Sequence, residues 1–323
     1  MPSTPGTPPN PGQSPNTTFP KGFVWGAASS AYQIEGAADV DGKGPSIWDV
    51  FTHKPGATFM GHTGDVACDH YHRYPQDIAL MRQIGLRAYR FSLAWARILP
   101  EGTGRVNEAG LAFYDRLVDG LLEEGITPWV TLFHWDYPQA LYRRGGWLNR
   151  ESPEWFAEYT RVVVDRLSDR VTNWITINEP QIYLGPDHGE SCGAPGMRPT
   201  THDRLITAHH TLLSHGRAVQ VIRAHAKKPP AVGWAPIGRT KFPASERPED
   251  VAAARSLTLG IVKSDFWNNT WFADPVVLGS YPEDGVRVYG APMDFVKSGD
   301  MEAIRQPLDF YGVNIYDGER IRA

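Results

Sequence analysis

Two neighbouring polar residues in the middle of the sequence have the side chains needed for acid–base chemistry. Asn178 and Glu179 follow the apolar run 172–177, and Pro180 comes directly after them. Proline lacks a backbone N–H, so it ends the ladder of a strand. A carboxyl group at such a strand end is partly shielded from water, which raises its pKa and suits it to donate a proton near neutral pH. Taken alone, the motif is equally compatible with a glutamate that only caps a loop.

Polar and aromatic side chains also end other apolar runs. They are Gln33, the pair His134 and Trp135, and the pair Asn314 and Tyr316. Functional groups that gather from many strand ends are typical of a (β/α)8 barrel, whose active site lies at the carboxyl ends of its strands. Gln33 alone carries no signal, and His134 or Trp135 could also be core residues.

The elements that would position these groups alternate along the chain. Six apolar runs are predicted as strands buried on both faces, namely 23–28, 87–93, 128–133, 172–177, 231–236 and 309–316. Three amphipathic stretches, 108–124, 152–168 and 203–226, are predicted as helices. Asn107 is a candidate cap for the first of these helices, and Gly125 is its predicted end.

Alternation of strands and helices predicts a parallel sheet, either an open doubly wound sheet or a closed barrel. The nucleotide-binding form of the open sheet has a glycine-rich turn after its first strand, and residues 28–33 contain no glycine. We therefore predict an α/β fold of the (β/α)8 TIM-barrel type. Because the sequence supplies six strands and a barrel needs eight, we expect the barrel to be incomplete in this chain, with strands 1–6 only.

Composition narrows the class of protein. The chain has 323 residues, of which 41% are hydrophobic, with 11 Trp and a net charge of −4. This balance gives no electrostatic footprint for nucleic acid, and no run is long enough to span a membrane, so neither partner is expected. Two cysteines and no basic–apolar leader favour the cytoplasm. We expect residues 1–18, which are rich in proline, to be a disordered tail, and 19–323 to be the N-terminal portion of a single TIM-barrel domain.

Seven segments resemble, in the same order, the signature sequences of family-one glycoside hydrolases, the β-glucosidase family. They are 19–36, 46–49, 89–95, 132–135, 145–147, 176–180 and 309–314. The resemblance covers about residues 19–320 and implies a TIM barrel that hydrolyses terminal β-D-glucosides with retention, without a cofactor. Short β-linked oligosaccharides, β-galactosides and β-fucosides are further candidate substrates, and cellulose degradation is a candidate context.

The resemblance also implies the catalytic residues. Glu179 matches the general acid/base of the family. Tyr316 matches a tyrosine that hydrogen-bonds the nucleophile, and Arg90 matches an arginine that keeps the nucleophile ionised. The family usually has an aromatic residue where this chain has Ile315, which alternation would point away from the pocket. Arg90 could instead form a structural ion pair inside the barrel.

Five further residues match sugar-binding positions of the family. Gln33 is expected to hold the 3- and 4-hydroxyls, His134 the 3-hydroxyl, and Asn178 the 2-hydroxyl of the sugar. Trp135 is expected to wall the pocket that holds the terminal sugar, and Asn314 belongs to the same set.

A retaining glycosidase needs a second carboxyl group about 5–5.5 Å from the first. In the family, this nucleophile lies in a Thr-Glu-Asn-Gly-type motif on strand 7, and no such motif occurs in this sequence. We expect a complementary C-terminal segment, from the same polypeptide or a second chain, to cover the edges of strands 1 and 6, and no activity without it. The alternatives are a dead or split fragment that acts as a sugar-binding or interaction module, and a 6-phosphoglycosidase.

The histidines invite a metal hypothesis, which the spacing does not favour. A metal-dependent barrel hydrolase would place His-x-His at the end of strand 1, whereas His70 and His72 fall about 40 residues later. His209 and His215 do not share a tight helical face, and His210 lies beside them. We therefore expect no metal and assign these histidines to packing and capping.

Overall fold

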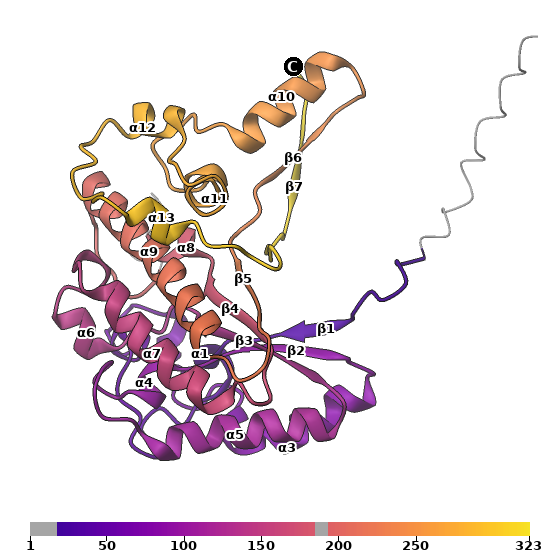
Figure 1. Ribbon diagram of the computed structural model, residues 1–323, viewed down its shortest axis with the longest axis vertical. Helices are drawn as coiled ribbons and strands as arrows, with labels where there is room; N and C mark the ends of the chain where they lie inside the picture. Colours follow the sequence, from indigo (N-terminus) through magenta and orange to yellow (C-terminus); the bar gives the residue numbers. More distant parts are fainter. Residues whose placement is uncertain (1–17, 185–192) are drawn as a thin grey trace, which may run out of the picture.

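Five parallel strands form the central sheet of the protein (Figure 1). A computed structural model describes residues 18–184 and 193–323. Nearly all of the predicted tail, residues 1–18, and Cys192 therefore lie outside the described residues. The strands are β1 (Gly26–Ala28), β2 (Ala88–Ser92), β3 (Thr127–Phe133), β4 (Asn173–Asn178) and β5 (Ala231–Ala235).

The order of the strands identifies the architecture. Each strand pairs in parallel with the next one along the chain, in the order β1-β2-β3-β4-β5. An open doubly wound sheet reverses its strand order at a switch point, whereas a barrel winds in one direction. The described part of the chain is therefore an arc of a (β/α)8 barrel, as the sequence predicted.

The predicted sixth strand, 309–316, differs from the expectation. It runs along β5 but joins it by one isolated bridge, between Ile237 and Asn314. The amides of Asp309, Gly312 and Asn314 donate to the carbonyls of residues 232, 234 and 236, each at 2.9 Å. Between the first two of these bonds, the segment 309–316 advances by three residues while β5 advances by two, so a bulge interrupts the ladder. In addition, Pro236 has no N–H to donate back to the segment.

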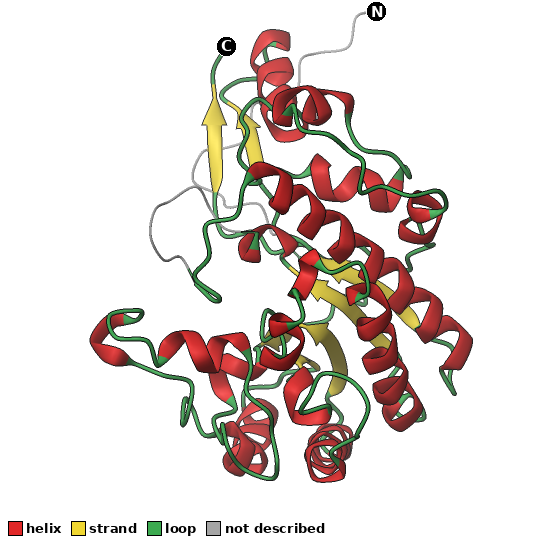
Figure 2. Cartoon of the chain, turned by 90° about the vertical axis from the view of Figure 1, so that its left-hand side faces the viewer, coloured by secondary structure: helices red, strands yellow, loops and turns green. Residues whose placement is uncertain are grey.

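Four long helices accompany the strands (Figures 1 and 2). They are α3 (His70–Gln83), α5 (Glu108–Glu123), α7 (Ser152–Leu167) and α9 (Thr201–His225). The three helices predicted from periodicity correspond to α5, α7 and α9, and α7 packs against α9. Gly125 ends α5 with a φ of 69°, as predicted. The prediction for Asn107 is wrong in part, because its side chain makes no cap bond and donates instead to the carbonyls of Asp41 and Arg97.

Short elements follow the strands. They are α1 (Ala31–Ile34), α2 (Ile47–Thr52), η1 (Phe59–Gly61), α4 (Trp95–Ile98), α6 (Gln139–Arg143), η2 (Gly146–Leu148) and α8 (Pro180–Tyr183). In a parallel barrel such connections start at the carboxyl ends of the strands, where function is concentrated. Candidate site residues lie at two of these connections, since Gln33 belongs to α1 and Glu179 immediately precedes α8.

The C-terminal part of the described chain forms a cap of helices around a small second sheet, at the top of Figure 1 in orange and yellow. Its elements are β6 (Thr240–Pro243), α10 (Pro248–Leu259), α11 (Thr270–Val277), α12 (Glu283–Tyr289), α13 (Asp300–Ile304) and β7 (Gly318–Ile321). Strands β6 and β7 pair in parallel and were not predicted. A separate apolar cluster that includes Leu212, Trp234 and Trp271 joins this cap to α9 and β5.

Strand β1 lies at an exposed edge of the sheet. It begins at Gly26 rather than at residue 23, and all three of its residues are exposed. Before it, Phe19, Phe23 and Trp25 contact one another through their rings, with centroids 4.5 to 4.8 Å apart, while remaining about half exposed. Nowhere in the described ranges is a helix both long and apolar enough to cross a membrane.

Candidate active site

The end of β4 positions the proposed acid/base. Asn178 closes the strand and is fully buried, and Glu179 is 4% exposed. Glu179 has a left-handed backbone, with φ 44° and ψ 65°, and its N–H donates to the carbonyl of Ala235 on β5 at 2.8 Å. Pro180 then begins α8, so the predicted stop of the strand at this proline is confirmed.

The left-handed conformation of Glu179 changes how the two side chains are presented. In a regular strand, successive side chains point to opposite faces. Here the side chains of both Asn178 and Glu179 bond to the same amide. The Nδ2 of Asn314 donates to Oδ1 of Asn178 at 3.0 Å and to Oε1 of Glu179 at 2.7 Å. The break in alternation at position 179 therefore brings an amide and a carboxyl from adjacent residues to a common partner.

The end of β3 has the same feature. Trp135 has φ 81°, a value that residues other than glycine rarely adopt. Its indole N–H donates to the carbonyl of Asn178 at 3.0 Å, and Nε2 of His134 lies 3.1 Å from Nδ2 of Asn178. Both side chains of the His-Trp pair thus contact the residue that precedes the proposed acid.

Arg90, in the middle of β2, connects the remaining groups. Its Nε donates to Oγ1 of Thr131 at 2.9 Å and its Nη1 to Oδ1 of Asn314 at 3.3 Å, while Nη2 donates to Oδ1 of Asn178. We call the set that these bonds join the strand-end network: Arg90, Thr131, His134, Trp135, Asn178, Glu179 and Asn314. Six of its members were predicted from the sequence, whereas Thr131 was missed, since nothing distinguishes it from other strand threonines.

The network fixes the proton on His134. Oδ1 of Asn178 accepts from Arg90 and Asn314, so its Nδ2 must be the group that faces His134. Nε2 of His134 therefore accepts, and the proton lies on Nδ1, which is buried and has no hydrogen-bond partner among the described residues. Burial and the nearby charge of Arg90 lower the pKa of His134 to about 3. The imidazole is thus a neutral donor with an unused N–H.

Opposing effects act on the pKa of Glu179. Burial raises the pKa of its carboxyl group, in the direction expected for a strand-end acid. The hydrogen bond from Asn314 and the positive charge of Arg90 lower it, but by less than burial raises it. The guanidinium of Arg90 in turn has its pKa lowered by desolvation, against the attraction of Glu179 and Tyr316.

Two predicted residues lie outside the network. Gln33 is an exposed residue of α1, directly after β1. Tyr316 follows Asn314 by two positions and is 85% exposed, although it is close enough to Arg90 to affect the pKa of the guanidinium. Among the described residues, no hydrogen bond joins either side chain to the network.

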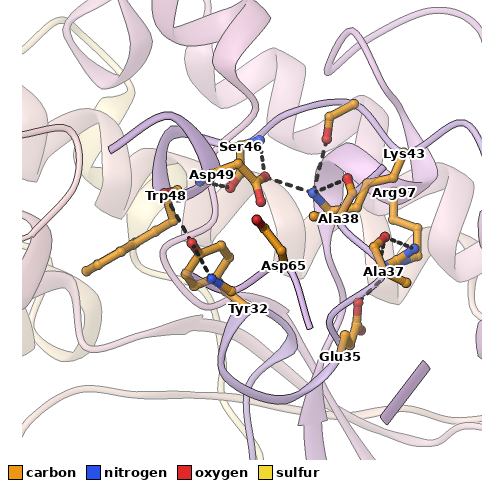
Figure 3. A network of polar contacts seen from close by, with 12 residues as sticks. Tyr32, Glu35, Ala37, Ala38, Lys43, Ser46, Trp48, Asp49, Asp65 and Arg97 are labelled. Atoms are coloured by element: carbon orange, nitrogen blue, oxygen red, sulfur yellow. Dashed lines mark hydrogen bonds and ion pairs between the residues drawn. The ribbon is translucent and has the colours of Figure 1, made fainter. Parts of the chain in front are cut away.

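The loop after β1, which follows Gln33, is anchored by buried ion pairs that the sequence analysis missed (Figure 3). Nε of Arg97 lies 3.0 Å from Oε2 of Glu35, and the other carboxylate oxygen of Glu35 accepts from the hydroxyl of Tyr114 at 2.7 Å. Lys43 pairs with Asp49 at 2.8 Å in the same loop. No periodicity or spacing in the sequence connects Glu35 with Arg97 and Tyr114, because they come from different connections of the barrel.

Asp136 lies next to this cluster and directly after Trp135. Its side chain is buried, and Oδ1 has no hydrogen-bond partner among the described residues. Burial, together with the negative charge of Glu35, raises the pKa of Asp136 to about 8. A cavity of about 10 Å³ beside it, which Glu35 and Lys43 also line, has room for about one water molecule.

A larger cavity, of about 690 Å³, lies beside the network rather than within it. Trp135 lines it, together with aromatic residues from β3 and several connections, whereas Arg90, Asn178 and Glu179 do not. These aromatic residues are Trp48, Phe133, Tyr137, Tyr142, Trp147 and Tyr183. Trp135 therefore borders both the polar network and the aromatic cavity.

The histidines of the metal hypothesis bond to protein groups. His209 bonds through Nε2 to Asp300 at 2.9 Å and through Nδ1 to the hydroxyl of Tyr281 at 3.0 Å. His210 bonds to the carbonyl of Trp147 at 2.8 Å, and His215 to Thr176 at 2.6 Å. Within residues 18–184 and 193–323, no group of three or more His, Cys, Asp or Glu is arranged to hold a metal ion.

The chain is similar to known proteins over most of its length. The model of glycosyl hydrolase family 1 matches residues 15–323 of the sequence. The chain belongs to glycosyl hydrolase family 1. Family-1 relatives include the β-glucosidase A of Acetivibrio thermocellus and that of Thermotoga maritima, each 46% identical over 94% of this chain. An aryl-phospho-β-D-glucosidase of Bacillus subtilis is 41% identical over 93% of it.

Solved family-1 structures have the same fold. The β-glucosidase of Thermotoga maritima in complex with deoxynojirimycin superposes with a TM-score of 0.81 at 45% identity over 94% of this chain. The chain spans about 66% of the length of that structure, and 66% of the length of both β-glucosidase A relatives. The barrel fold places the carboxyl ends of neighbouring strands at one edge of the sheet.

Proposed function

We propose that this family-1 chain supplies the acid/base side of a retaining β-glucosidase active site, with Glu179 as the general acid/base. The observation that supports it is the buried carboxyl of Glu179 at the end of β4, whose pKa is raised by burial. A general acid must hold its proton until the glycosidic oxygen needs it, and a raised pKa favours the protonated form. The names of the relatives, β-glucosidase A and 1,4-β-D-glucan glucohydrolase, support the β-glucoside class of substrate.

The sugar would be held on the side of the network that His134 faces. The unused Nδ1–H of His134 is a donor for a hydroxyl group, and the indole of Trp135 offers a flat face for a sugar ring. Asn178 is expected to contact the 2-hydroxyl, and Gln33 the 3- and 4-hydroxyls. The phospho-β-glucosidase among the relatives keeps a 6-phosphorylated sugar as a second candidate substrate.

The opposing nucleophile would come from a complementary segment. All of β1 is exposed, and the segment 309–316 pairs with β5 on one side while Tyr311, Val313 and Ile315 are exposed. Tyr316, the proposed partner of the nucleophile, is also exposed. An unpaired strand edge is a ready template for another strand. We infer that two strands dock between these edges and place a carboxylate about 5 Å from that of Glu179.

The alternative is a sugar-binding module without hydrolysis. It keeps the same ligand contacts but needs no second carboxylate. Hydrolysis of a chromogenic β-glucoside by the purified protein separates the two functions. Intact mass measurement of the same sample shows whether a second polypeptide accompanies the chain. Activity from a lone, monomeric 35.9 kDa species would overturn the proposal of a complementary segment.

The role of Glu179 has its own test. Glu179→Gln should slow the hydrolysis of glucosides with poor leaving groups by a factor on the order of 10²–10⁴. Activated aryl glucosides, which need little protonation of the leaving group, should keep much of their glycosylation rate. Glu123→Gln, an exposed residue at the end of α5, is the matched control and should change neither. Equal losses on both substrates would contradict acid catalysis by Glu179.

We also propose the cytoplasm as the compartment. Cys68 is a free, exposed thiol, which is easier to maintain where the environment is reducing. Cell fractionation with an antibody against the chain tests this, and recovery from the medium would contradict it.

A further inference from the structure

The side chain of Asn314 is held in one orientation. Its Oδ1 accepts from Nη1 of Arg90 at 3.3 Å, so its Nδ2 must face the opposite way. Nδ2 then donates to Oδ1 of Asn178 at 3.0 Å and to Oε1 of Glu179 at 2.7 Å. The guanidinium of Arg90 has no acceptor lone pair and Oδ1 of Asn178 cannot donate, so a flipped amide would lose both of these contacts.

The backbone of Asn314 is fixed as well. Its N–H donates to the carbonyl of Pro236 at 2.9 Å, and its carbonyl accepts from the N–H of Gly238 at 2.9 Å. This is the one bridge that ties the segment 309–316 to the chain after β5. Asn314 therefore reaches Glu179 from an anchored backbone position rather than from a free loop.

These bonds leave Asn314 little capacity for a sugar. Both hydrogens of its amide are committed to Asn178 and Glu179, and one of the two lone pairs on Oδ1 is committed to Arg90. A substrate hydroxyl would have to displace one of these contacts. The expectation that Asn314 binds substrate is thus less consistent with the geometry than a role directed at Glu179.

We propose that Asn314 is a positioning residue for Glu179, holding Oε1 of the carboxyl group and leaving Oε2 as the oxygen that carries the acidic proton. This inference rests on the proposed acid/base function of Glu179. Because Oε1 accepts an N–H, it is the carbonyl oxygen of the protonated acid, and the proton lies on Oε2. As Oε2 gives that proton to the glycosidic oxygen, the C–O bond breaks and the opposing carboxylate of the proposed site bonds to the anomeric carbon. The bond from Asn314 to Glu179 then becomes charge-assisted and stronger.

The chemistry assigns Asn314 a defined effect. A hydrogen bond to a carboxylate favours the ionised form and lowers the pKa. Asn314 therefore counteracts the burial of Glu179, so that the group can lose its proton in one step of the reaction and accept one in the next. Arg90 orients the amide that does this, which links β2 to an acid on β4.

The test measures Glu179 directly. The chain is labelled with ¹³C at the glutamate side-chain carboxyl, and the signal that disappears in Glu179→Gln identifies the residue. Asn314→Ala should raise the NMR-measured pKa of Glu179 by about one unit, because one donated hydrogen bond is lost. Asn314→Asp keeps the shape, loses the donor and adds charge, so it should raise that pKa further. An unchanged titration in either folded variant would overturn the proposal.

A second readout separates this inference from the proposed function. In the active assembly, Asn314→Ala should move the alkaline limb of the pH profile of kcat/KM to higher pH, by the same amount as the pKa of Glu179 rises. It should also lower kcat for substrates with poor leaving groups, while KM changes less than about threefold. A rise in KM with an unmoved pH profile would instead make Asn314 a sugar ligand. If the NMR titration shifts but no β-glucoside is hydrolysed, the positioning role stands and the proposed function fails.

Discussion

Nε of Arg97 lies 3.0 Å from Oε2 of Glu35, and both side chains are buried. Arg97 also donates to the carbonyl of Gly36 at 3.0 Å, and its guanidinium lies 4.4 Å from the ring centroid of Tyr71. The pair joins the connection after β1 to the connection after β2. It therefore holds the loop that starts at Gln33 against the body of the barrel.

Removing one member of this pair should destabilise the protein strongly. Glu35→Gln leaves the guanidinium of Arg97 buried without a counter-charge, and we expect a loss of about 3–5 kcal/mol in the free energy of unfolding. The control is Glu124→Gln, which breaks the exposed pair with Arg82 and should cost less than about 1 kcal/mol. Urea denaturation followed by tryptophan fluorescence measures both, and equal midpoints for the two variants would contradict the expectation.

Asp136 should make the protein less stable in alkali. Burial raises its folded-state pKa to about 8, above the ordinary value of 3.8, so the folded state binds the extra proton. The resulting stabilisation is complete below about pH 4 and is lost as the pH rises through 8. Lys43 offsets part of this shift, whereas Glu35 and Asp49 add to it. In Asp136→Asn, the fall in stability between pH 5 and pH 9 should be smaller than in the parent protein; parallel curves would show that Asp136 does not titrate in this range.

Asp300 should have the opposite dependence. Although burial opposes ionisation, bonds from Arg150, the N–H of Lys297 and His209 lower its pKa to about 2. Its contribution to stability is present above about pH 4 and is lost as the pH falls through 2. Asp300→Asn should therefore unfold more readily than the parent protein at pH 6, with the difference shrinking toward pH 2. Circular dichroism melts across this range provide the measurement, and a constant difference would refute the role.

Sugar binding through His134 should not depend on pH in the physiological range. With a pKa near 3, the imidazole is neutral at pH 5 and at pH 8, so its Nδ1–H remains a donor throughout. His134→Phe keeps the ring but removes this donor, and should weaken glucose binding roughly 5- to 10-fold, as expected for one lost hydrogen bond. Quenching of tryptophan fluorescence by glucose gives the affinity. A steep loss of parent-protein affinity between pH 8 and pH 5 would contradict the neutral state.

The strands could be predicted from the sequence because parallel barrel strands are continuous apolar runs. The runs 87–93, 128–133, 172–177 and 231–236 all became strands with small shifts at their ends. The run 23–28 lost its first half, since Phe23 and Trp25 pack on each other rather than on a neighbouring strand. The run 309–316 became an interrupted strand, because a bulge and Pro236 are properties of the pairing partner and not of the run itself.

The site could be predicted in part. The side chains that end β3 and β4 were found because they break an apolar run with polar groups. The direction of Asn314 could not be found in this way, since it follows from three hydrogen bonds to residues on other strands. Thr131 and Asp136 were missed for the same reason, because their neighbours in space and not their neighbours in sequence set their environment.

The left-handed residues Trp135 and Glu179 also limit how the protein can vary. Each allows one strand end to contribute two adjacent side chains to the same face, so β3 and β4 each contribute a pair. Deleting or inserting a single residue in β4 would shift Asn178 and Glu179 together and disconnect both from Asn314. Length changes in this family-1 chain should therefore be tolerated in the outer connections and not within these two strands.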